Sequence, residues 1–350
     1  MVSPIYIMIV GLAAAFLLPL FEKGGRGLTA AVFLAATGAI AAISIQWLVH
    51  LSGGAPEAMT FTAGFRPPFS INLRMGMEEA ALSSAAGLAG LSGAVYLVRD
   101  LSRHGARSMM LYVLLIMGLD GMILTRDIFN LFVFIEITGI AGYALVAMRQ
   151  DVEALSAGLK YAMAGAVASI FMLLGIILIY SQTGTLNIDG MTAAARGLSA
   201  GTIAAPAVFM LVFAFMIETK QFPANGWAID VYDRADPGVA AVISAAGSGA
   251  ALFALYKVLP LAGAGWYRAA AIAGIATFMA SNMIALRQDR ASRLLGYSST
   301  GQMGLLLAVV AFGLQGRLGS SFYLIAGGLF LNHLLAKAGL FWLSGVTGAG

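Results

Sequence analysis

Long apolar runs recur along this 350-residue chain and limit its fold more than any other feature. A helix needs about 20 apolar residues to cross the hydrocarbon layer, whereas a strand of a membrane barrel alternates over about ten. These runs do not alternate, so we expect an all-α, polytopic transmembrane helix bundle of about eleven spans. The expected spans are 3–20, 28–50, 78–98, 109–125, 128–148, 161–180, 203–222, 238–259, 268–286, 295–313 and 319–346.

The composition excludes several classes of protein. Only 10% of the residues are charged and 60% are hydrophobic, whereas soluble domains carry charge on about 25%. The chain has no cysteine, so it offers no thiolate for a disulfide or an iron–sulfur cluster. His50, His104 and His333 are far apart in the sequence, which argues against a bis-histidine haem. We therefore expect no cofactor and no metal on this chain, no nucleic-acid partner, and no independent catalytic activity.

The basic residues beside short loops predict an orientation. One side holds Lys23, Arg26, Arg99, Arg103, Arg107, Arg149, Arg287, Arg290 and Arg293. The opposite side still holds Arg66, Arg74, Arg126, Arg196, Arg268 and Arg317, so the bias is modest. We expect the first side to be cytoplasmic, which places the N-terminus outside and the chain in the inner (cytoplasmic) membrane. No basic residue precedes the first apolar run, so we also expect an uncleaved first span.

Glu136 is an acid in the middle of an apolar run, RDIFNLFVFIEITGIAGYAL at 126–145. On a helix it lies about 13 Å beyond Asp127, close to the centre of a hydrocarbon layer about 30 Å thick. Ionisable groups at this depth are costly and typically mark ion pathways. We interpret Glu136 as a candidate proton-relay residue, and the alternative is a structural acid hydrogen-bonded between two helices.

A second unusual stretch, MIETKQFPANGW at 216–227, brings two charges and a proline into an apolar run. Pro223 removes a backbone donor, which predicts a kinked or broken helix near 218–227. Unwound backbone inside a membrane is tolerated only against protein or water. Glu218 and Lys220 therefore predict a hydrated cavity at the break. The alternative is that the span ends at Glu218 and both charges lie at the membrane surface.

Further ionisable residues occur in three other spans. His333 and Lys337 are four residues apart and share one helix face, so they are candidates for a proton relay or for a polar stripe that joins two helices. Lys257 ends its span just before Pro260, and we expect it to reach the membrane surface rather than to act in function. Asp120 is central to its span and has no obvious partner in the sequence.

Six stretches together resemble the antiporter-like membrane subunits of complex I (NADH:quinone oxidoreductase), of Mrp-type sodium/proton antiporters and of membrane-bound hydrogenases. They are PPFSINL at 67–73, the stretch 126–145, the stretch 158–188, FPANGW at 222–227, RLLGYSSTGQMG at 293–304 and HLLAKAGLF at 333–341. Their order and spacing together are specific. The resemblance implies about fourteen helices with two inverted five-helix units, each containing a broken helix. It also implies proton movement along a hydrated chain of buried charges.

The resemblance assigns some residues directly. Glu136 matches the acid of the family's fifth helix, and His333 and Lys337 match the histidine and lysine of its eleventh. The family's broken helix has a lysine five residues before the proline, where this chain has Glu218. Lys220 stands two residues later, so on a regular helix it would be turned about 200° away from the usual direction.

Two other departures concern the second half of the chain. The basic residue of the family's eighth helix falls near Ser248 or Gly249, and Lys257 comes too late to match it. The second broken helix, expected in a twelfth span, is absent. We expect either that another chain completes the pattern or that the gene product is longer. Within one integral membrane domain, 1–350, the expected parts are the first three spans 1–108, a first five-helix repeat 109–259 and a partial second repeat 268–346.

The leading hypothesis is a proton-translocating membrane subunit of a multi-subunit redox complex of the NADH:quinone oxidoreductase or hydrogenase type. Its expected partners are other membrane subunits, peripheral iron–sulfur subunits and the lipid bilayer. In this hypothesis Glu136 pairs with Lys220, Glu218 shares a proton with Glu136 if the two face each other, and His333 and Lys337 continue the path. One alternative is a subunit of an Mrp-type sodium/proton antiporter. The other is a non-conducting structural paralogue.

Overall fold

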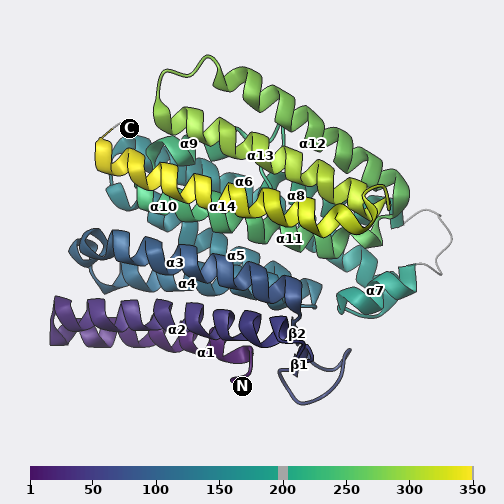
Figure 1. Ribbon diagram of the computed structural model, residues 1–350, viewed down its shortest axis with the longest axis horizontal. Helices are drawn as coiled ribbons and strands as arrows, with labels where there is room; N and C mark the ends of the chain where they lie inside the picture. The colour runs from purple at the N-terminus through teal and green to yellow at the C-terminus, as the bar shows by residue number, and fades with distance from the viewer. Residues whose placement is uncertain (196–203, 349–350) are drawn as a thin grey trace.

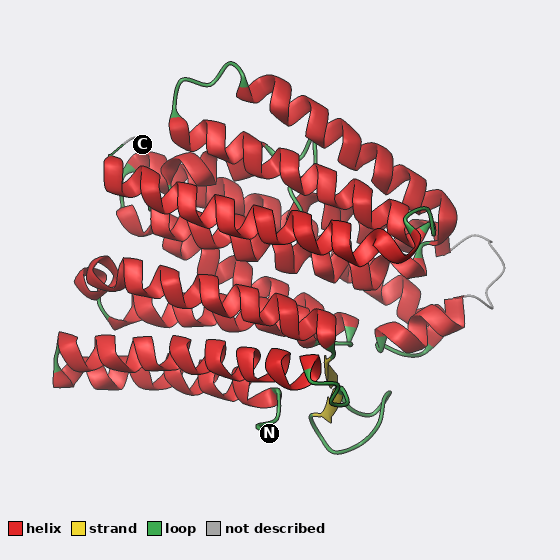
Figure 2. Cartoon of the chain, in the orientation of Figure 1, coloured by secondary structure: helices red, strands yellow, loops and turns green. Residues whose placement is uncertain are grey.

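The computed structural model describes residues 1–195 and 204–348. In this part of the chain ten helices are long and apolar enough to cross a membrane, and one further apolar helix is shorter. The chain is therefore a multi-pass membrane protein, and the expected all-α bundle is confirmed (Figure 2). Arg196 and the first residue of the expected span 203–222 lie outside the described residues.

The long helices follow the expected spans with shifts of a few residues at most ends. The α-helices in the first half are α1 (Ile5–Phe21), α2 (Arg26–Ser52), α3 (Met77–His104), α4 (Ala106–Leu124), α5 (Ile128–Val146), α6 (Val152–Thr183) and α7 (Ile188–Ala195). Those in the second half are α8 (Ala204–Glu218), α9 (Gly226–Arg234), α10 (Pro237–Val242), α11 (Ser248–Val258), α12 (Gly263–Ala285), α13 (Ala291–Leu314) and α14 (Phe322–Thr347). A small antiparallel sheet, β1 (Ala58–Phe61) and β2 (Asn72–Met75), pairs Ala58 with Met75.

The helices run nearly side by side, so their ends gather at two faces of the molecule (Figure 1). α1 and α2 form one edge, α3 and α4 lie beside them, and the helices from α5 onward form the rest of the bundle. The N-terminus, the β1–β2 sheet and α7 lie at one end, and the C-terminus lies at the other.

Side-chain caps fix where several helices begin. Asp127 accepts a hydrogen bond from the backbone N–H of Asn130 at 2.8 Å at the start of α5, and Asp151 does the same for Ala154 at 2.7 Å at the start of α6. Asp236 caps α10, where Pro237 occupies the first turn, a position in which its missing N–H costs nothing. These caps satisfy donors that a helix start leaves free.

Glycine allows α12 and α13 to cross at very short range. A Cβ atom at Gly274 would lie 2.5 Å from the carbonyl oxygen of Gly304, and a Cβ at Gly304 would lie 2.6 Å from that of Gly274. Membrane helices often associate through such small-residue contacts, because no hydrophobic force drives apolar helices together inside lipid.

Two interruptions break otherwise continuous spans. α8 ends at Glu218 and α9 begins at Gly226, so the expected break near 218–227 is confirmed. The span formed by α10 and α11 contains a π turn, Ile243–Gly247, and nearly all residues of this span are buried inside the bundle. Unlike the first interruption, the π turn was not expected from the sequence. Both lie inside the bundle and position the site described next.

Candidate functional site

The end of α8 gives Lys220 an unusual backbone conformation. The N–H of Gln221 donates to the carbonyl of Met216 at 2.9 Å, and the N–H of Lys220 donates to that of Ile217 at 3.0 Å. This is the hydrogen-bond pattern of a Schellman motif, whose left-handed residue is usually glycine. Here that residue is Lys220, with φ of 60°. A side chain in this conformation is strained, and such strain is often found at functional sites.

The Lys220 side chain points into the bundle and is only 3% exposed. Its Nζ donates to Ser248 Oγ at 2.6 Å and lies 3.5 Å from the carbonyl oxygen of Ile243. Nζ also lies 5.8 Å from the ring centre of Trp227 and 5.6 Å from that of Tyr232, within range of a cation–π interaction. The ammonium is therefore held by a hydroxyl, a carbonyl and two aromatic faces.

The end of α8 explains how Lys220 can point into the bundle although it stands two residues after the position of the family's lysine. The expectation that Lys220 faces away applies to a regular helix, but α8 ends before Lys220 and the chain turns there. The alternative in which both charges lie at the membrane surface is wrong for Lys220, because its side chain is buried inside the bundle.

The π turn 243–247 presents polar groups on both of its sides. Ser248 Oγ, which binds Lys220, also donates to the Ile243 carbonyl at 3.3 Å. The Ser244 carbonyl accepts a hydrogen bond from His333 Nε2 at 2.9 Å. π turns inside α-helices are frequent at functional sites. In this protein the turn lies between the lysine of the broken helix and the histidine of α14.

His333 is buried, with 1% of its surface exposed, and both ring nitrogens have partners. A carbonyl can only accept, so Nε2 carries a proton whether the ring is neutral or charged. Nδ1 lies 2.9 Å from Oε1 of Gln302. When the ring is charged, Nδ1 carries a proton and donates it to the Gln302 amide oxygen. When the ring is neutral, Nδ1 accepts, and rotation of the Gln302 amide by half a turn presents its NH2 group as the donor. His333 can therefore change its charge and keep both hydrogen bonds.

Lys337 lies on the same buried side of α14 as His333 and is 2% exposed. Its Nζ donates to Ser298 Oγ at 2.7 Å. The next residue, Ser299, shares a hydrogen bond of 2.8 Å with Ser244 Oγ on the π turn. Ser298 and Ser299 are consecutive residues of α13, so the helix backbone brings Lys337 close to the same π turn that contacts Lys220 and His333.

Glu218 and Glu136 are the two acids near Lys220. Glu136 on α5 is partly buried and accepts a hydrogen bond from Ser169 on α6. Lys220 and Glu218 line a cavity of about 30 Å³ together with Thr138, which is on α5 near Glu136. A buried water needs about 10–15 Å³ of such space, so the cavity can hold at least one.

The expected direct pairing of Glu136 with Lys220 is not what the structure shows. In the described part of the chain, the partner of Glu136 is Ser169 and the partner of Lys220 is Ser248. The bond from Glu136 to Ser169 joins α5 to α6, which is the geometry of the structural alternative. Glu218, and not Glu136, lines the cavity with Lys220, so the cavity joins Lys220 to Glu218.

Lys257 does not reach the membrane surface, and that expectation is wrong. Its side chain is 5% exposed and its Nζ donates to the carbonyls of Met122 at 2.7 Å, Ile123 at 2.9 Å and Thr125 at 2.8 Å. These carbonyls lie at the C-terminal end of α4, where a helix leaves acceptors free and favours positive charge. Lys257 is a cap for a neighbouring helix.

Asp120 has partners that the sequence did not indicate. Ser83 Oγ donates to Asp120 Oδ1 at 2.5 Å, and Ser83 shares a hydrogen bond of 2.7 Å with Ser44. Asp120 is completely buried, and these three residues join α4, α3 and α2. This cluster lies in the N-terminal helices and has no recorded contact with Lys220, His333 or Lys337 among the described residues.

Sequence reasoning missed Ser244 and the polar group Ser298, Ser299 and Gln302, and it named Ser248 only as a position where the family's basic residue is missing. The last three occur together in RLLGYSSTGQMG, and their spacing places them on adjacent positions of one helix inside an apolar span. That pattern could have identified them as partners for buried charges. Over residues 1–195 and 204–348, no group of three or more histidine, cysteine, aspartate or glutamate side chains is arranged to hold a metal.

Comparison with known proteins gives consistent relatives. A family model described as NADH:quinone oxidoreductase/Mrp antiporter, TM, matches residues 125–349. The chain is 31% identical to NADH-quinone oxidoreductase subunit N of Desulforudis audaxviator, over 98% of this chain and 69% of that protein. It is 34% identical to NADH-quinone oxidoreductase subunit N of Rubrobacter xylanophilus, over 58% of this chain and 44% of that protein. The match to the Rubrobacter protein thus covers less than half of that protein's length.

Solved structures show the same relationship. The fold is similar to a chain of the membrane-bound sulfane sulfur reductase, an archaeal respiratory membrane complex, with a TM-score of 0.90 and 29% identity over 99% of this chain and 71% of that chain. It is also similar to a chain of the Mrp complex from Dietzia sp., with a TM-score of 0.85 and 25% identity over 97% of this chain and 62% of that chain. These relatives are parts of multi-subunit membrane complexes.

Proposed function

Since this chain belongs to the NADH:quinone oxidoreductase/Mrp antiporter family of transmembrane proteins, we propose that it is a proton-translocating subunit of a respiratory-type redox complex. We propose the NADH:quinone oxidoreductase or hydrogenase type, with other membrane subunits as direct partners. The relatives named NADH-quinone oxidoreductase subunit N and the respiratory sulfane sulfur reductase support a redox complex. Because this chain has no cysteine, the iron–sulfur clusters of such a complex belong to peripheral partner subunits.

The observation that supports this function best is the connection between Lys220, His333 and Lys337. Lys220 and His333 contact the π turn 243–247 directly, and Lys337 bonds to Ser298, whose neighbour in the chain, Ser299, bonds to Ser244 of that turn. Hydroxyl groups both donate and accept, so they can pass a proton between basic groups. A structural role alone does not account for three costly buried bases gathered around one π turn.

In this mechanism a proton on one base disfavours a proton on its neighbours, because like charges repel in a medium of low dielectric constant. Proton occupancy therefore moves along the line rather than accumulating. Glu218 lines the cavity with Lys220 and biases the charge of Lys220 across it, and Glu136 acts on Glu218 through repulsion between like charges. We assign Lys257 and Asp120 to helix capping and helix packing, outside the relay.

The orientation belongs to the same proposal. Arg149 and Arg290 line one pocket with Gly348, close to the C-terminus. The connections α1–α2, α3–α4 and α12–α13, in or beside which the other basic residues of the more positive side occur, lie at the same end of the bundle (Figure 1). The positive-inside rule places that end in the cytoplasm. The N-terminus and the β1–β2 sheet then lie outside, and the membrane is the inner (cytoplasmic) membrane.

The test is a comparison of two lysine variants in the native complex, sealed into vesicles. Lys220→Met removes the buried charge, and Lys160→Met removes a lysine that is half-exposed and paired with Asp230. Proton translocation, followed with a pH-sensitive dye and divided by the electron-transfer rate, should fall at least about tenfold in Lys220→Met, which is about 1.4 kcal/mol. Lys160→Met should remain near wild type. Wild-type translocation in an assembled Lys220→Met complex would contradict the proposal.

A second candidate function is a subunit of a sodium/proton antiporter, favoured by the similarity to the Mrp complex over 97% of this chain. The two functions differ in their driving force. A redox-driven pump translocates protons only while electrons flow and does so without sodium. An antiporter moves protons when a sodium gradient is imposed, with no electron donor present. Measuring proton movement under each condition in the same vesicles separates them.

A further inference from the structure

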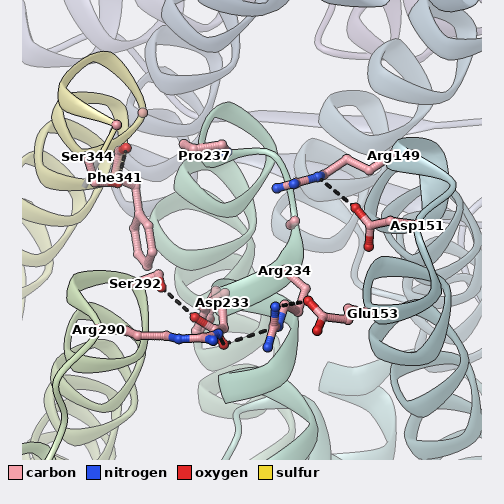
Figure 3. Close-up of a pocket in the computed structure, with 14 residues that line it drawn as sticks. Arg149, Asp151, Glu153, Asp233, Arg234, Pro237, Arg290, Ser292, Phe341 and Ser344 are labelled. Atoms are coloured by element: carbon pink, nitrogen blue, oxygen red, sulfur yellow. Dashed lines mark hydrogen bonds and ion pairs between the residues drawn. The ribbon is translucent and has the colours of Figure 1, made fainter. Parts of the chain in front are cut away.

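A polar pocket of about 380 Å³ opens at the end of the bundle where α9, α13 and α14 meet, near the start of α6 (Figure 3). We call it the cytoplasmic pocket, following the orientation proposed above. Its charged lining residues are Arg149, Asp151, Glu153, Asp233, Arg234 and Arg290. The proposed proton relay does not include any of them.

The charges of this pocket are balanced among themselves. Arg149 pairs with Asp151 at 3.2 Å, Arg234 pairs with Glu153, and Arg290 pairs with Asp233 at 3.2 Å. The lining thus presents three positive and three negative groups in pairs, with no net charge to select an anion or a cation. A polar space of this size is filled by water.

Asp233 fixes the inner wall of the pocket. Its side chain is 2% exposed and lies against Arg234 at 3.3 Å, Arg290 at 3.2 Å and Arg293 at 3.6 Å. Ser292 Oγ also donates to it at 2.5 Å (Figure 3). A buried carboxylate with several cationic partners is costly to displace. These contacts tie the end of α9 to the start of α13 and hold the preceding residue, Tyr232, in place.

Tyr232 lies between the cytoplasmic pocket and the relay. It lines the pocket, yet it is only 2% exposed. Its ring centre is 5.6 Å from Lys220 Nζ, and its hydroxyl is 3.5 Å from Ser248 Oγ. Phe341 packs beside it with ring centres 5.6 Å apart. Tyr232 therefore belongs to the lining of the pocket, and its ring contacts the first base of the relay.

We propose that the cytoplasmic pocket is the site of proton uptake, and that Tyr232 excludes bulk water from Lys220 while its hydroxyl passes protons to Ser248. The proposal rests on the function proposed above and identifies where its protons come from. The contact of 3.5 Å is at the outer limit of a hydrogen bond, so transfer requires a small movement of the ring that shortens it. A closed ring at rest prevents water from connecting the two sides of the membrane.

The chain has no cysteine, so single cysteines report directly on access by water. Ser344→Cys places a thiol in the pocket, and Ser248→Cys places one behind Tyr232. The assembled complex is exposed to a small, membrane-impermeant anionic methanethiosulfonate on the cytoplasmic face, and the mass of this chain is then measured. We expect modification of Ser344→Cys and protection of Ser248→Cys. Combining Ser248→Cys with Tyr232→Ala, or with the less drastic Tyr232→Leu, should expose the thiol.

Two matched variants complete the design. Tyr112→Ala removes a ring of the same size that is fully buried between α3 and α4, and it should leave Ser248→Cys protected. Tyr232→Phe keeps the ring and removes the hydroxyl, so Ser248→Cys should remain protected while proton translocation falls at least about tenfold. These results together support the proposal.

Several results would overturn it. Modification of Ser248→Cys with Tyr232 intact means that the ring does not exclude water. Protection in both Tyr232→Ala and Tyr232→Leu, with Ser344→Cys modified, means that the pocket does not lead to Lys220. Wild-type proton translocation in Tyr232→Phe means that the Tyr232 hydroxyl does not pass protons. Thiol access does not depend on pumping, so failure of the proposed function alone leaves the accessibility pattern unchanged and is told apart in this way.

Discussion

The backbone of Lys220 gives a prediction that separates stability from function. Lys220→Ala and Lys220→Gly both remove the ammonium, its bond to Ser248 and its contacts with the aromatic rings. The two variants differ only in the Cβ atom, which alanine has and glycine lacks, at a position whose φ is 60°. Any residue with a Cβ loses about 1–2 kcal/mol in this left-handed conformation, and glycine does not. Glycine gains about 0.4–1 kcal/mol of freedom in the unfolded chain, which offsets part of the difference.

Lys220→Gly should therefore be more stable than Lys220→Ala by about 1 kcal/mol, or roughly 2 °C in thermal midpoint. The assay is thermal unfolding of the purified chain in one detergent, with both variants measured side by side. Val167, on the exposed side of α6, provides the control. There the order should reverse, with Val167→Gly less stable than Val167→Ala by about 1 kcal/mol, because glycine is a poor residue inside a helix.

Both Lys220 variants should translocate protons equally poorly, because both lack the base. If Lys220→Ala is as stable as Lys220→Gly or more so, α8 does not end in a left-handed residue, and the position of the Lys220 side chain derived from that end is wrong. If the stability order holds but translocation differs between the two, the ammonium is not what the relay requires.

Three further predictions concern other parts of the structure. Lys257→Met leaves three carbonyls at the end of α4 without their donor and should lower the free energy of unfolding by about 3 kcal/mol, whereas Lys257→Arg should recover part of the loss. Equal thermal stability of the wild type and both variants refutes the cap. Gln302→Leu removes the partner of His333 Nδ1 and should lower proton translocation about tenfold at an unchanged electron-transfer rate, and wild-type pumping would show that this contact is dispensable. Gly274→Ala places a methyl group against the backbone of Gly304 and should destabilise the chain by about 1–3 kcal/mol, so an unchanged thermal midpoint argues against the close crossing of α12 and α13.

Much of the fold followed from the sequence because each span has to satisfy its own backbone hydrogen bonds inside lipid. That constraint makes the helices local, so hydropathy alone placed them. The broken helix was also predictable, since Pro223 and two charges interrupt an apolar run. The position of His333 and Lys337 on one helix face followed from their spacing of four residues.

Contacts between distant segments could not be predicted in the same way. The π turn depends on packing of the α10–α11 span, and its sequence, ISAAG, has no local mark of a π conformation. Lys257 is more than a hundred residues from the carbonyls it binds, so nothing in the sequence favoured a cap over a surface position. The direction of Lys220 depended on one left-handed residue that glycine, not lysine, usually occupies.

The missing base near Ser248 also has a structural explanation. A Cβ at Gly249 would lie 2.1 Å from the ring of Phe330, so the ring of α14 fills the space that a larger side chain would need. Ser248 instead presents a hydroxyl to Lys220. In the proposed relay the lysine of the broken helix therefore contacts the eighth span through a hydroxyl rather than through a second base.

The central claim is that Lys220, His333 and Lys337 move protons. The most direct test is the number of protons translocated per electron pair by the native complex carrying Lys220→Met, His333→Leu and Lys337→Met together, compared with the wild-type complex. We predict a lower ratio for the triple variant, with electron transfer and assembly retained. An unchanged ratio in a fully assembled triple variant would contradict the claim and favour a structural subunit that conducts no protons.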